Sequence, residues 1–434
     1  MRRDMRFHMN NPVRPGELAI VVGAGVSGAA AGKLLCALGA RVRLLEKNPD
    51  RIMPAHLQLA QECGIEMIAG PHAAEHFQGA SLVVPSPGVP LQSLLPLLAS
   101  AGYPRMMAEM ELASLFVEEP VLAVTGTSGK TTTTSLCAAM LQESGKKVFL
   151  GGNIGPPLSE YVLSGGHCDV AVLEASSFQL MGCSSFHPHV AVLLNISPNH
   201  LDQHADMEEY VAAKFRIFAC QTAEDAAVIQ AELVPEARAR NVAARIVSFA
   251  ESGRFMETPL AGKHNQANIE AAYMACRELG VSLETAQKAA AAFMPLPNRL
   301  ELVGEWNAIA YVNDSKCTTV SALHAALESM ERPVHLLAGG LFKGGNLATL
   351  IPLLGQKVRS VALFGGSREE FCRAWRDTVP TPWFPTLEEA VRHVRGLARR
   401  GDAILLAPAT SSYDQYDDYE ERGEDFRRMA RMLQ

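Results

Sequence analysis

The stretch that most constrains the fold is Val121-Leu-Ala-Val-Thr-Gly-Thr-Ser-Gly-Lys-Thr-Thr132, where a β-prone apolar run meets a glycine loop. A helical pattern follows through residues 136–141. The order strand, glycine loop, helix predicts a cradle of inward-pointing backbone amides and a helix N-terminus that faces a polyphosphate. In such a loop Lys130 reaches phosphate oxygens and the hydroxyl of Thr131 ligates Mg²⁺. The segment predicts a binding site for a nucleoside triphosphate.

The loop departs from the usual G-x4-GK[ST] spacing, because the first glycine of that pattern falls on Val124. The alternative interpretation is a strand-to-helix turn that uses glycine for geometry alone. Since the glycines, the lysine and the hydroxyl all fall in the expected context, we favour the nucleotide site. The residues expected to bind ATP in this loop are Gly126, Thr127, Ser128, Gly129, Lys130, Thr131 and Thr132.

Length and composition limit the class of protein. A chain of 434 residues predicts two or three domains, and the net charge of −7 argues against a nucleic-acid or membrane-surface binder. The nine cysteines are scattered without a C-x-x-C pair, which favours a reducing compartment over a disulfide or zinc framework. The polar segment Met1–Gly16 lacks the apolar core of a signal peptide, and no run of eighteen apolar residues follows. We expect a cytoplasmic protein without membrane insertion.

The N-terminal region carries a dinucleotide-type fingerprint. The strand Glu17–Val22 is followed by Gly23-Ala-Gly25-Val-Ser-Gly28 and an Ala/Leu-rich helix, and the strand Val42–Leu45 ends in Glu46. Taken alone, this G-x-G-x-x-G unit favours a nicotinamide dehydrogenase. The pattern requires only that the turn bind a diphosphate, so several types of nucleotide are compatible with it.

Polar residues follow three further predicted strands. The strand Ala80–Val84 leads into Pro85-Ser-Pro-Gly-Val-Pro90, which is compatible with a ligand loop or with a rigid turn. The strand Asp169–Glu174 ends in a carboxylate, the position at which phosphate-loop enzymes keep an acid for Mg²⁺ or water. His200 follows the strand Val190–Ile196. A loop histidine is ordinarily solvated, but a shared edge with Lys130 and Glu174 favours a ligand role.

Lys214 lies on the apolar face of a predicted helix. Residues 207–218 show helical periodicity, Asp206 and Glu209 are spaced as a capping box, and Lys214 falls within an apolar stripe that starts at Tyr210. One explanation is a lysine that snorkels at a helix edge. The other is a desolvated lysine whose lowered pKa gives a free amine for chemistry.

The last third of the chain predicts another α/β domain. Asn265 and Asn268 lie three apart near the start of an Ala-rich helix, and their spacing is compatible with capping and with base recognition. Pro295-Leu-Pro297 marks a boundary, after which four apolar strands alternate with helical patterns. The predicted strands of this region are Ala308–Val312, Val334–Ala338, Ser360–Phe364 and Ala403–Ala407.

Seven motifs occur in order along the chain: Ser86-Pro-Gly88, Gly126-Thr-Ser-Gly-Lys-Thr131, Gly152-Asn-Ile-Gly155, Asn199-His-Leu-Asp-Gln-His204, His264-Asn-Gln-Ala-Asn268, Asn313-Asp-Ser-Lys316 and Ser411-Ser-Tyr-Asp-Gln415. Together they resemble the motifs of the Mur ligases, the ATP-dependent amide-forming enzymes of peptidoglycan precursor synthesis. The resemblance runs from Leu18 to the C-terminus and is greatest for the members that add D-glutamate. It implies an α/β protein of three domains. These are a Rossmann-like domain over 1–106, a central phosphate-loop ATPase-like domain over 107–297 and a Rossmann-like domain over 298–434.

The resemblance implies which residues meet each substrate. UDP-MurNAc-L-alanine would be held by Gly25, Val26, Ser27, Glu46, Lys47, Ser86, Pro87, Gly88, Asn153 and His200. The residues that would join the central loop around ATP are Asn265, Asn268, Arg299 and Asp314. D-Glutamate would be bound by Lys316, Thr318, Lys343, Ser412, Tyr413 and Tyr419.

The implied chemistry is activation followed by aminolysis. The alanine carboxylate attacks the γ-phosphate of ATP, and the amine of D-glutamate then displaces phosphate from the acyl phosphate. The catalytic residues would be Lys130, Glu174, His200 and Lys214. Of two Mg²⁺ ions, one would be held by Thr131 and Glu174 and the other by His200 and a carbamylated Lys214, because carbamylation turns an amine into an anionic oxygen ligand.

Four alternatives remain open at this point. A dehydrogenase explains only the N-terminal fingerprint, and an ATP-driven regulatory module explains only the central loop. A folylpolyglutamate synthase shares the two later domains but not the N-terminal glycine loop. The same ligase chemistry with L-glutamate is the fourth, since the Gly339-Gly-Leu-Phe-Lys343 loop and Thr319 depart from the family pattern beside the amino-acid pocket. We expect a monomer whose domains close around the substrates.

Overall fold

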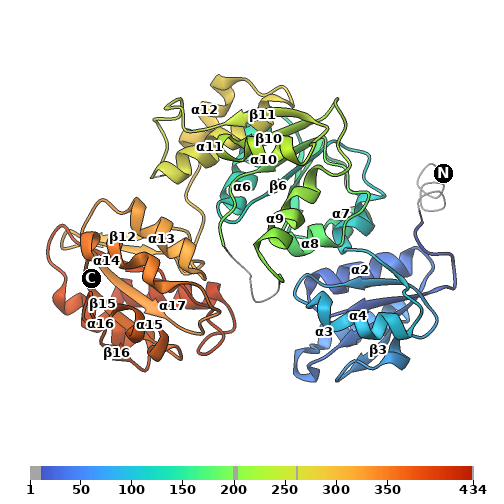
Figure 1. The fold of residues 1–434 in the computed structure, drawn as a ribbon, viewed down its shortest axis with the longest axis horizontal. Helices are drawn as coiled ribbons and strands as arrows, with labels where there is room; N and C mark the ends of the chain where they lie inside the picture. The colour runs from blue at the N-terminus through green and yellow to red at the C-terminus, as the bar shows by residue number, and fades with distance from the viewer. Residues whose placement is uncertain (1–10, 199–203, 261, 433–434) are drawn as a thin grey trace. The chain divides into compact units, whose positions relative to one another are not determined.

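The computed structural model describes residues 11–198, 204–260 and 262–432. The chain contains three β-sheets and divides into two compact units (Figure 1). The first unit comprises Met1–Ile196, Ala205–Ala250 and Asn268–Ala290 and holds two sheets, and the second comprises the remainder and holds the third sheet. The predicted boundary at residues 297/298 lies near this division, while the predicted boundary at 106/107 falls inside the first unit.

The first sheet is parallel and has the order β3-β2-β1-β4-β5. Its elements are β1 (Leu18–Val22), α2 (Val26–Ala37), β2 (Arg41–Glu46), η1 (Pro49–Arg51), α3 (Pro54–Cys63), β3 (Glu66–Ala69), η2 (Ala74–Phe77), β4 (Ala80–Pro85), α4 (Leu91–Ser100), β5 (Arg105–Met106) and α5 (Glu109–Ser114). The predicted Rossmann-like unit is confirmed. The strand order reverses between β1 and β4, so the loops after these two strands meet at the edge where such sheets bind ligands.

The central sheet is parallel and has the order β11-β10-β9-β6-β8-β7. Its elements are β6 (Val121–Thr125), α6 (Lys130–Glu143), β7 (Val148–Gly152), α7 (Leu158–Ser164), β8 (Val170–Glu174), α8 (Ser177–Met181), β9 (Val190–Leu193), α9 (Met207–Phe215), η3 (Arg216–Phe218), β10 (Ala226–Gln230), η4 (Ala231–Leu233), α10 (Val234–Ala239), β11 (Arg245–Phe249), α11 (Lys263–Arg277) and α12 (Leu283–Ala292). Since β6 lies between β9 and β8, the glycine loop after β6 is flanked by the ends of both neighbours.

Helix α5 joins the first two sheets through buried carboxylates. One oxygen of Glu111 accepts hydrogen bonds from the backbone amides and hydroxyls of Ser184 and Ser185, at 2.7–3.1 Å. Glu109 accepts the amide hydrogen of Ser159 at 2.7 Å, and burial raises its pKa. Helices α2, α5 and α7 pack together in one apolar core that the two sheets share.

The third sheet is mixed and has the order β12-β13-β17-β14-β15-β16, with β12 antiparallel at its edge. The elements of this region are β12 (Glu301–Trp306), β13 (Ile309–Asn313), α13 (Val320–Ser329), β14 (Val334–Gly339), η5 (Leu347–Leu350), α14 (Ile351–Lys357), β15 (Val358–Phe364), α15 (Arg368–Trp375), β16 (Trp383–Phe384), α16 (Leu387–Leu397), β17 (Ala403–Leu406) and α17 (Tyr419–Met432). Four of its parallel strands, β13, β14, β15 and β17, are those predicted from the sequence, displaced by one or two residues at their ends.

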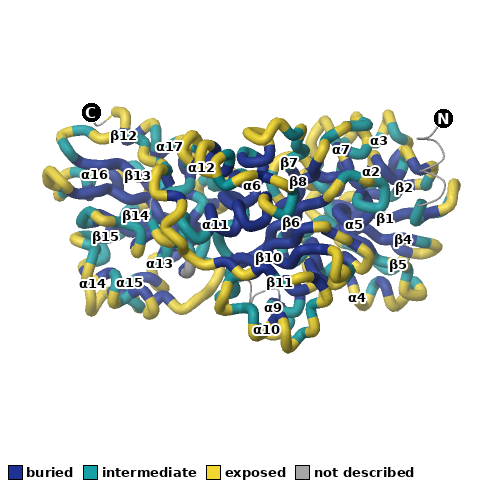
Figure 2. The backbone as a smooth tube through the Cα atoms, turned by 90° about the horizontal axis from the view of Figure 1, so that it is seen from above, coloured by how far each residue is buried: buried dark blue, intermediate teal, exposed yellow. Residues whose placement is uncertain are grey.

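Helices cover both faces of the third sheet. Alternate strand residues such as Leu336 and Leu405 pack with α13, η5 and α15, whereas Leu337 and Leu406 pack with α16 and α17. This alternation of buried side chains is the period of two that a parallel sheet covered on both faces requires. The strands β13, β14 and β17 are buried along their whole length, and buried backbone lies towards the inside of this region in Figure 2.

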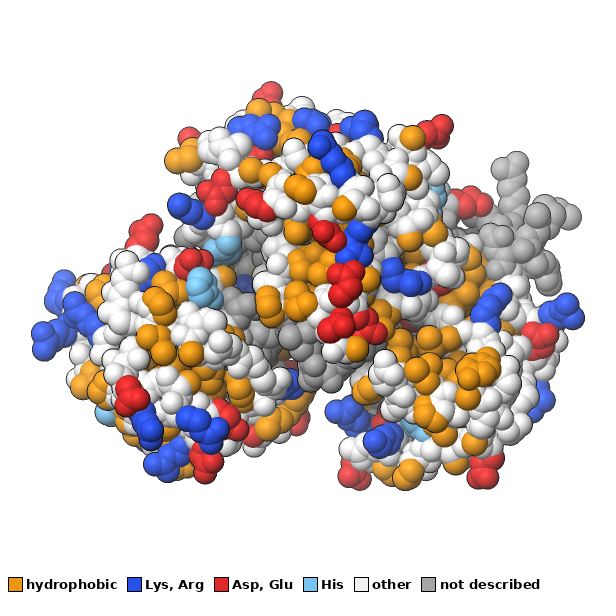
Figure 3. Space-filling model, in the orientation of Figure 1, with side chains coloured by type: hydrophobic (Ala, Val, Ile, Leu, Met, Phe, Trp, Pro, Cys, Tyr) orange, Lys and Arg blue, Asp and Glu red, His pale blue; other side chains and the backbone are white. Residues whose placement is uncertain are grey.

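Two surface observations bear on possible partners. On the face drawn in Figure 3, basic and acidic side chains are interspersed and form no field of one sign. Among the described residues, no helix is long and apolar enough to cross a membrane.

The helix predicted over residues 207–218 is shorter than expected. It ends at Phe215 and continues as one 3₁₀ turn, Arg216–Phe218. Asp206 is its N-cap and accepts the amide hydrogen of Glu209, but the carboxylate of Glu209 accepts from Ala205 rather than from Asp206. The predicted cap is confirmed, and the reciprocal half of the capping box is wrong.

Candidate active site

The glycine loop between β6 and α6 has the backbone geometry of a phosphate cradle. Gly126 and Gly129 have φ angles of +155° and +82°, which residues with a Cβ rarely adopt. A Cβ on Gly129 would lie 2.3 Å from Oδ1 of Asn268, so α11 packs directly on the loop. Asn268 lies beyond the first turn of α11, which begins at Lys263, and it therefore does not cap that helix.

Asn195 fastens this loop from the neighbouring strand. Its Oδ1 accepts the amide hydrogen of Ser128 at 2.9 Å, its Nδ2 donates to the carbonyl of Ser128 at 3.1 Å, and its own carbonyl accepts from Thr127 at 2.9 Å. Sequence reasoning missed this residue. Its position in the sequence could have identified it. Asn195 directly follows the apolar run of β9, and β9 pairs with β6, so Asn195 lies beside the loop after β6.

Thr131 and Glu174 meet as predicted at the carboxyl edge of the central sheet. Oγ1 of Thr131 donates to Oε2 of Glu174 at 2.7 Å, and Nδ2 of Asn153 donates to Oε1 at 2.7 Å. Glu174 is buried, so its carboxylate is oriented by these two donors rather than by solvent. A hydroxyl and a carboxylate are hard oxygen ligands of the kind that Mg²⁺ prefers, and these two residues fit that ion.

Two lysines converge on one carbonyl of the loop. Nζ of Lys130 donates to the carbonyl oxygens of Gly126 and Thr127 at 2.9 Å, and Nζ of Lys214 donates to the same oxygen of Gly126 at 2.8 Å. Lys214 is 2% exposed. Burial lowers the pKa of Lys214 well below its usual value, and the charge of Lys130 lowers it further against a smaller opposing effect of Glu174. Of the two explanations, the structure favours the desolvated amine over snorkelling.

Tyr210 connects Lys214 to the loop. Its hydroxyl lies 3.0 Å from Oγ1 of Thr127, and its ring centroid lies 4.5 Å from Nζ of Lys214. Burial raises the pKa of Tyr210 to about 12, so the phenol stays protonated. The sequence placed Tyr210 on the apolar stripe without indicating these polar contacts. His200 lies outside the described residues.

The N-terminal glycine loop and the Ser86 loop meet at the reversal point of the first sheet. Oγ of Ser86 donates to the carbonyl of Gly23 at 3.0 Å, and a Cβ on Gly28 would lie 2.0 Å from that carbonyl oxygen. Glu46 is buried and accepts the amide hydrogens of Ala24 and Asn48 at 2.8 and 2.9 Å. Of the other residues predicted here, Gly25 precedes α2, Ser27 and Pro87 are half-buried, and Val26, Lys47 and Gly88 are exposed.

Arg299 precedes β12 and Asp314 follows β13, two strands of the second unit that pair with each other. Oδ1 of Asp314 accepts the amide hydrogen of Leu300 at 3.2 Å, and Asp314 is buried. Burial raises the pKa of Asp314 to about 7, against the opposing effects of the Leu300 amide and of Arg299. Asn265, also predicted to contact ATP, lies in the first turn of α11, with its amide bonded to Gly262.

Two lysine–tyrosine pairs lie at the loops after the parallel strands of the third sheet, with Tyr419 as the first residue of α17. Nζ of Lys316 lies 4.8 Å from the ring centroid of Tyr419, and Nζ of Lys343 lies 5.1 Å from that of Tyr413. All four had been predicted to bind the amino acid. Ser412 is buried in the same loop as Tyr413, and Thr318 is half-buried.

These loops are tied to one another. Leu341 and Ser411 exchange backbone hydrogen bonds at 3.0 and 3.1 Å, which joins the loop after β14 to the loop after β17. Thr319, a departure from the family pattern, is the N-cap of α13 and accepts from the amide of Ala322.

Arg422 of α17 supports the same region and was not singled out from the sequence. It is fully buried, its Nε donates to Oγ of Ser315, and its Nη2 donates to the carbonyls of Ser315 and Thr410. It thereby links the loop after β13 to the loop after β17. Burial lowers the pKa of Arg422 to about 10. The signal in the sequence was an arginine within the otherwise amphipathic Glu420–Met432 pattern.

The fold and the site define a phosphate-loop nucleotide enzyme with two further α/β sheets. The models for the Mur ligase middle domain and for the Mur ligase glutamate ligase domain match residues 124–255 and 298–410. The UDP-N-acetylmuramoylalanine--D-glutamate ligase of Nitratidesulfovibrio vulgaris is 56% identical over 97% of this chain and 98% of its own length. The ligase of the same name from Lawsonia intracellularis is 48% identical over 94% and 93%. The chain belongs to the Mur ligase family.

Solved structures agree on the fold. The MurF ligase of Thermotoga maritima, in complex with ADP, superposes with a TM-score of 0.61 at 17% identity and covers 98% of this chain and 97% of its own. A pseudomurein peptide ligase of Methanothermus fervidus gives 0.57 at 17% identity, over 96% and 100%. These identities show a common fold and nothing finer.

A third family model, the C-terminal domain of alanine dehydrogenase, matches residues 8–120. This model matches only the region of the N-terminal glycine loop, which is also the only region that the dehydrogenase interpretation explains. The relatives that match the whole chain carry ligase names, so the fingerprint indicates a shared nucleotide-binding fold rather than hydride transfer.

Proposed function

We propose that this chain is the ATP-dependent ligase that joins D-glutamate to UDP-N-acetylmuramoyl-L-alanine in peptidoglycan precursor synthesis. The observation that carries the proposal is the 56% identity, over 97% of the chain, to a ligase of that name. The Thr131–Glu174 pair beside a glycine loop gives the site that such ATP chemistry needs. The reaction releases ADP and phosphate.

The chain's own residues are arranged for activation of a carboxylate. The carboxylate of the alanine attacks the γ-phosphorus of ATP, ADP leaves, and an acyl phosphate forms. The amine of D-glutamate then attacks the acyl carbon, and phosphate departs as the amide forms and a proton is lost. Lys130 binds the transferring phosphate. Thr131 and Glu174 would hold a Mg²⁺ ion, which neutralises phosphate charge when bound.

Lys214 is proposed to act as a carbamate. Its amine is desolvated and shares the Gly126 carbonyl with a second lysine, which favours the neutral form. A neutral amine attacks the carbon of CO₂ and loses one proton, which leaves an anionic oxygen ligand. Together with His200, this group would hold a second Mg²⁺ ion.

We assign the remaining residues to the sites of the other two substrates. We assign UDP recognition to the loops around Ser86 and Glu46, because they meet at the strand-order reversal of the first sheet. The lysines of the two lysine–tyrosine pairs supply the positive charges for the two carboxylates of glutamate. We assign domains to residues 1–106, 107–297 and 298–434, and we expect a cytoplasmic monomer.

The decisive experiment measures phosphate release from ATP with UDP-MurNAc-L-alanine, in parallel with D-glutamate, L-glutamate, D-aspartate and no amino acid. Release with D-glutamate alone, together with a product heavier by one glutamate residue, is the expected result. Release with L-glutamate would retain the fold and the chemistry but change the substrate. Release that needs no amino acid would contradict the ligase assignment.

A further inference from the structure

A strained turn precedes β12 in the second unit. Asn298 and Leu300 have φ angles of +61° and +45°, in the left-handed region that residues other than glycine rarely occupy. Arg299 lies between them. Such a conformation persists only where surrounding contacts fix it, and it is often found where a side chain must be presented to a ligand.

Asn298 is fixed by hydrogen bonds on every side. Its amide donates to Oε2 of Glu301 at 2.8 Å, and its carbonyl accepts from the amide of Lys316 at 3.1 Å. Its Oδ1 accepts from Nδ2 of Asn313 at 2.8 Å and from Nη1 of Arg427 at 3.2 Å. Asn298 is 3% exposed, so these bonds are screened little by water.

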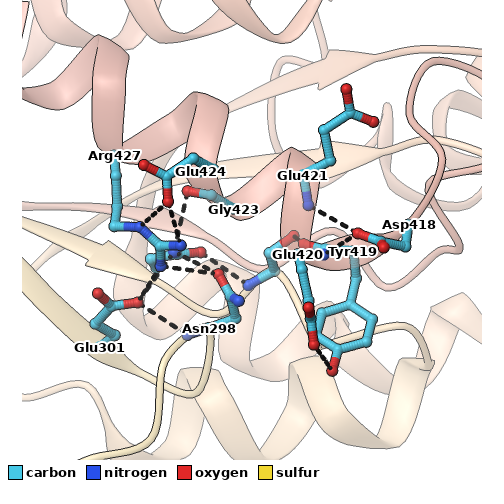
Figure 4. A network of polar contacts seen from close by, with 11 residues as sticks. Asn298, Glu301, Asp418, Tyr419, Glu420, Glu421, Gly423, Glu424 and Arg427 are labelled. Atoms are coloured by element: carbon cyan, nitrogen blue, oxygen red, sulfur yellow. Dashed lines mark hydrogen bonds and ion pairs between the residues drawn. The ribbon is translucent and has the colours of Figure 1, made fainter.

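Arg427 connects this turn to the C-terminal helix α17 (Figure 4). Its Nη1 donates to Oε2 of Glu301 at 2.8 Å, and its Nη2 donates to Oε2 of Glu424 at 2.7 Å. The side chain of Arg427 is 15% exposed. One guanidinium therefore joins two residues of the turn to the helix through charge-assisted hydrogen bonds.

Helix α17 packs directly against the turn at Asn298 through Gly423. A Cβ on Gly423 would lie 1.8 Å from Oδ1 of Asn298, so only glycine fits at this position of α17. Nδ2 of Asn313 also donates to the carbonyl of Gly423 at 3.3 Å. Helix α17 and the turn are therefore in direct contact, although Gly423 and Asn298 lie 125 positions apart in the sequence.

We propose that Arg427 is a positioning residue for ATP, which through Asn298 and Glu301 fixes the turn that carries Arg299 and orients Asp314. The proposal rests on the proposed function, together with the assignment of Arg299 and Asp314 to ATP that the resemblance to the Mur ligases implies. The link to Asp314 is direct, because the amide of Leu300 in this turn donates to Oδ1 of Asp314. Arg427 acts through the turn and contacts no substrate itself.

A purely structural role predicts a different result. If the network only stabilised the second unit, its loss would lower the melting temperature and the fraction of active enzyme without changing any KM. A positioning role weakens nucleotide binding selectively. It leaves UDP-MurNAc-L-alanine, which the first unit is proposed to bind, unaffected.

The test compares Arg427→Ala with Arg428→Ala on the same helix. Arg428 pairs with Asp425, and within the described part of the chain it makes no hydrogen bond or ion pair with the turn, so its loss removes a surface ion pair of similar kind. For Arg427→Ala, we expect the KM for ATP and the Kd of a non-hydrolysable ATP analogue to rise about ten-fold, whereas the KM for UDP-MurNAc-L-alanine stays within about two-fold. Arg428→Ala is expected to match the wild type. Arg427→Lys, which keeps the positive charge but has one donor nitrogen in place of three, should recover part of the affinity.

Glu301→Gln provides a second variant in case Arg427→Ala does not fold, because it removes the charge and keeps the shape. Equal changes in both KM values, or an unchanged Kd for the analogue in a folded variant, would overturn the proposal. The proposed function fails separately, if the wild type releases no phosphate with D-glutamate. Analogue binding, measured by calorimetry, tests the positioning role even then.

Discussion

At the scale of single residues, Lys214 has the most unusual environment in the described part of the active site. It is buried, it shares one carbonyl with Lys130, and its pKa is held well below the usual lysine value. A buried amine of this kind costs stability and is retained where chemistry needs it. The expected chemistry is carbamylation.

We predict that Lys214→Ala lowers kcat by about 100-fold or more, the size typical of losing a group that stabilises transition-state charge. Bicarbonate in excess is not expected to restore activity, because alanine has no amine to modify. Lys147→Ala, at an exposed position of the same unit, is the control. Near-normal turnover in Lys214→Ala, measured by phosphate release, would rule out the carbamate role.

Asp314 links stability to pH. Its pKa in the folded protein, about 7, lies above the ordinary aspartate value of 3.8, so between these values the folded state binds more protons than the unfolded state. Stability from this group is therefore greatest at low pH and falls as the pH rises through that window. Asp314→Asn should raise the melting temperature at pH 8, and the gain should vanish towards pH 4. Asp377→Asn, with a side chain that is 93% exposed, should show no such trend in a thermal scan.

Gly423 tests the contact between α17 and the turn at Asn298. Helix propensity alone favours Gly→Ala by about 1 kcal/mol. At Gly423 the added Cβ would meet Asn298, so we expect Gly423→Ala to destabilise the protein by about 1–3 kcal/mol. Gly396→Ala in α16, where nothing lies within 4 Å, should be neutral or stabilising. Denaturant unfolding measures both variants, and equal effects would contradict the close approach.

At the scale of elements, the phosphate loop depends on its neighbouring strand. The side chain of Asn195 bonds both the amide and the carbonyl of Ser128, which holds the loop open in one conformation. A loop that is already ordered before the ligand binds loses less conformational entropy on binding, which favours higher affinity.

We predict that Asn195→Ala raises the KM for ATP by about ten-fold, since two hydrogen bonds of about 1 kcal/mol each are lost from the loop. Asn346→Ala, which removes a helix cap in the second unit, is the matched control and should leave this KM unchanged. Steady-state kinetics with varied ATP distinguishes the two. An unchanged KM for ATP in Asn195→Ala would show that the loop is ordered without the hydrogen bonds of the Asn195 side chain.

At the scale of the whole molecule, the residues proposed to bind ATP belong to both compact units. Lys130 and Thr131 lie in the first, and Arg299 and Asp314 lie in the second. A ligand held by both units restricts their relative positions, as in enzymes that close over their substrates.

We predict that an ATP analogue and UDP-MurNAc-L-alanine together change the X-ray scattering profile of the protein and lower its radius of gyration. The same addition to Lys130→Ala, which is expected to bind the analogue poorly, should have a smaller effect. An unchanged profile in the wild type at saturating ligand would contradict closure.

Much of this architecture could be predicted from the sequence. The parallel strands and the loops after them follow from apolar runs that end in glycine or polar residues. Thr131, after the glycine loop, and Glu174, at the end of a strand, were expected at the same edge of the sheet. The strands β3, β5, β7, β10, β11, β12 and β16 were not predicted. Most of them are very short or only partly buried and lack a clear apolar period, whereas β10 is buried but offers only four apolar residues in a row.

What the sequence determined by itself is local: the strand, glycine loop and helix at Val121–Thr132, the apolar face that carries Lys214, and the order of the motifs. Tertiary structure alone decided that Asn195 would fasten the loop, that two lysines would share the carbonyl of Gly126, and that α17 would close on Asn298. The physical reason is that periodicity reports how a segment buries its own face. Which distant segment covers that face depends on strand order and packing, which no local pattern encodes.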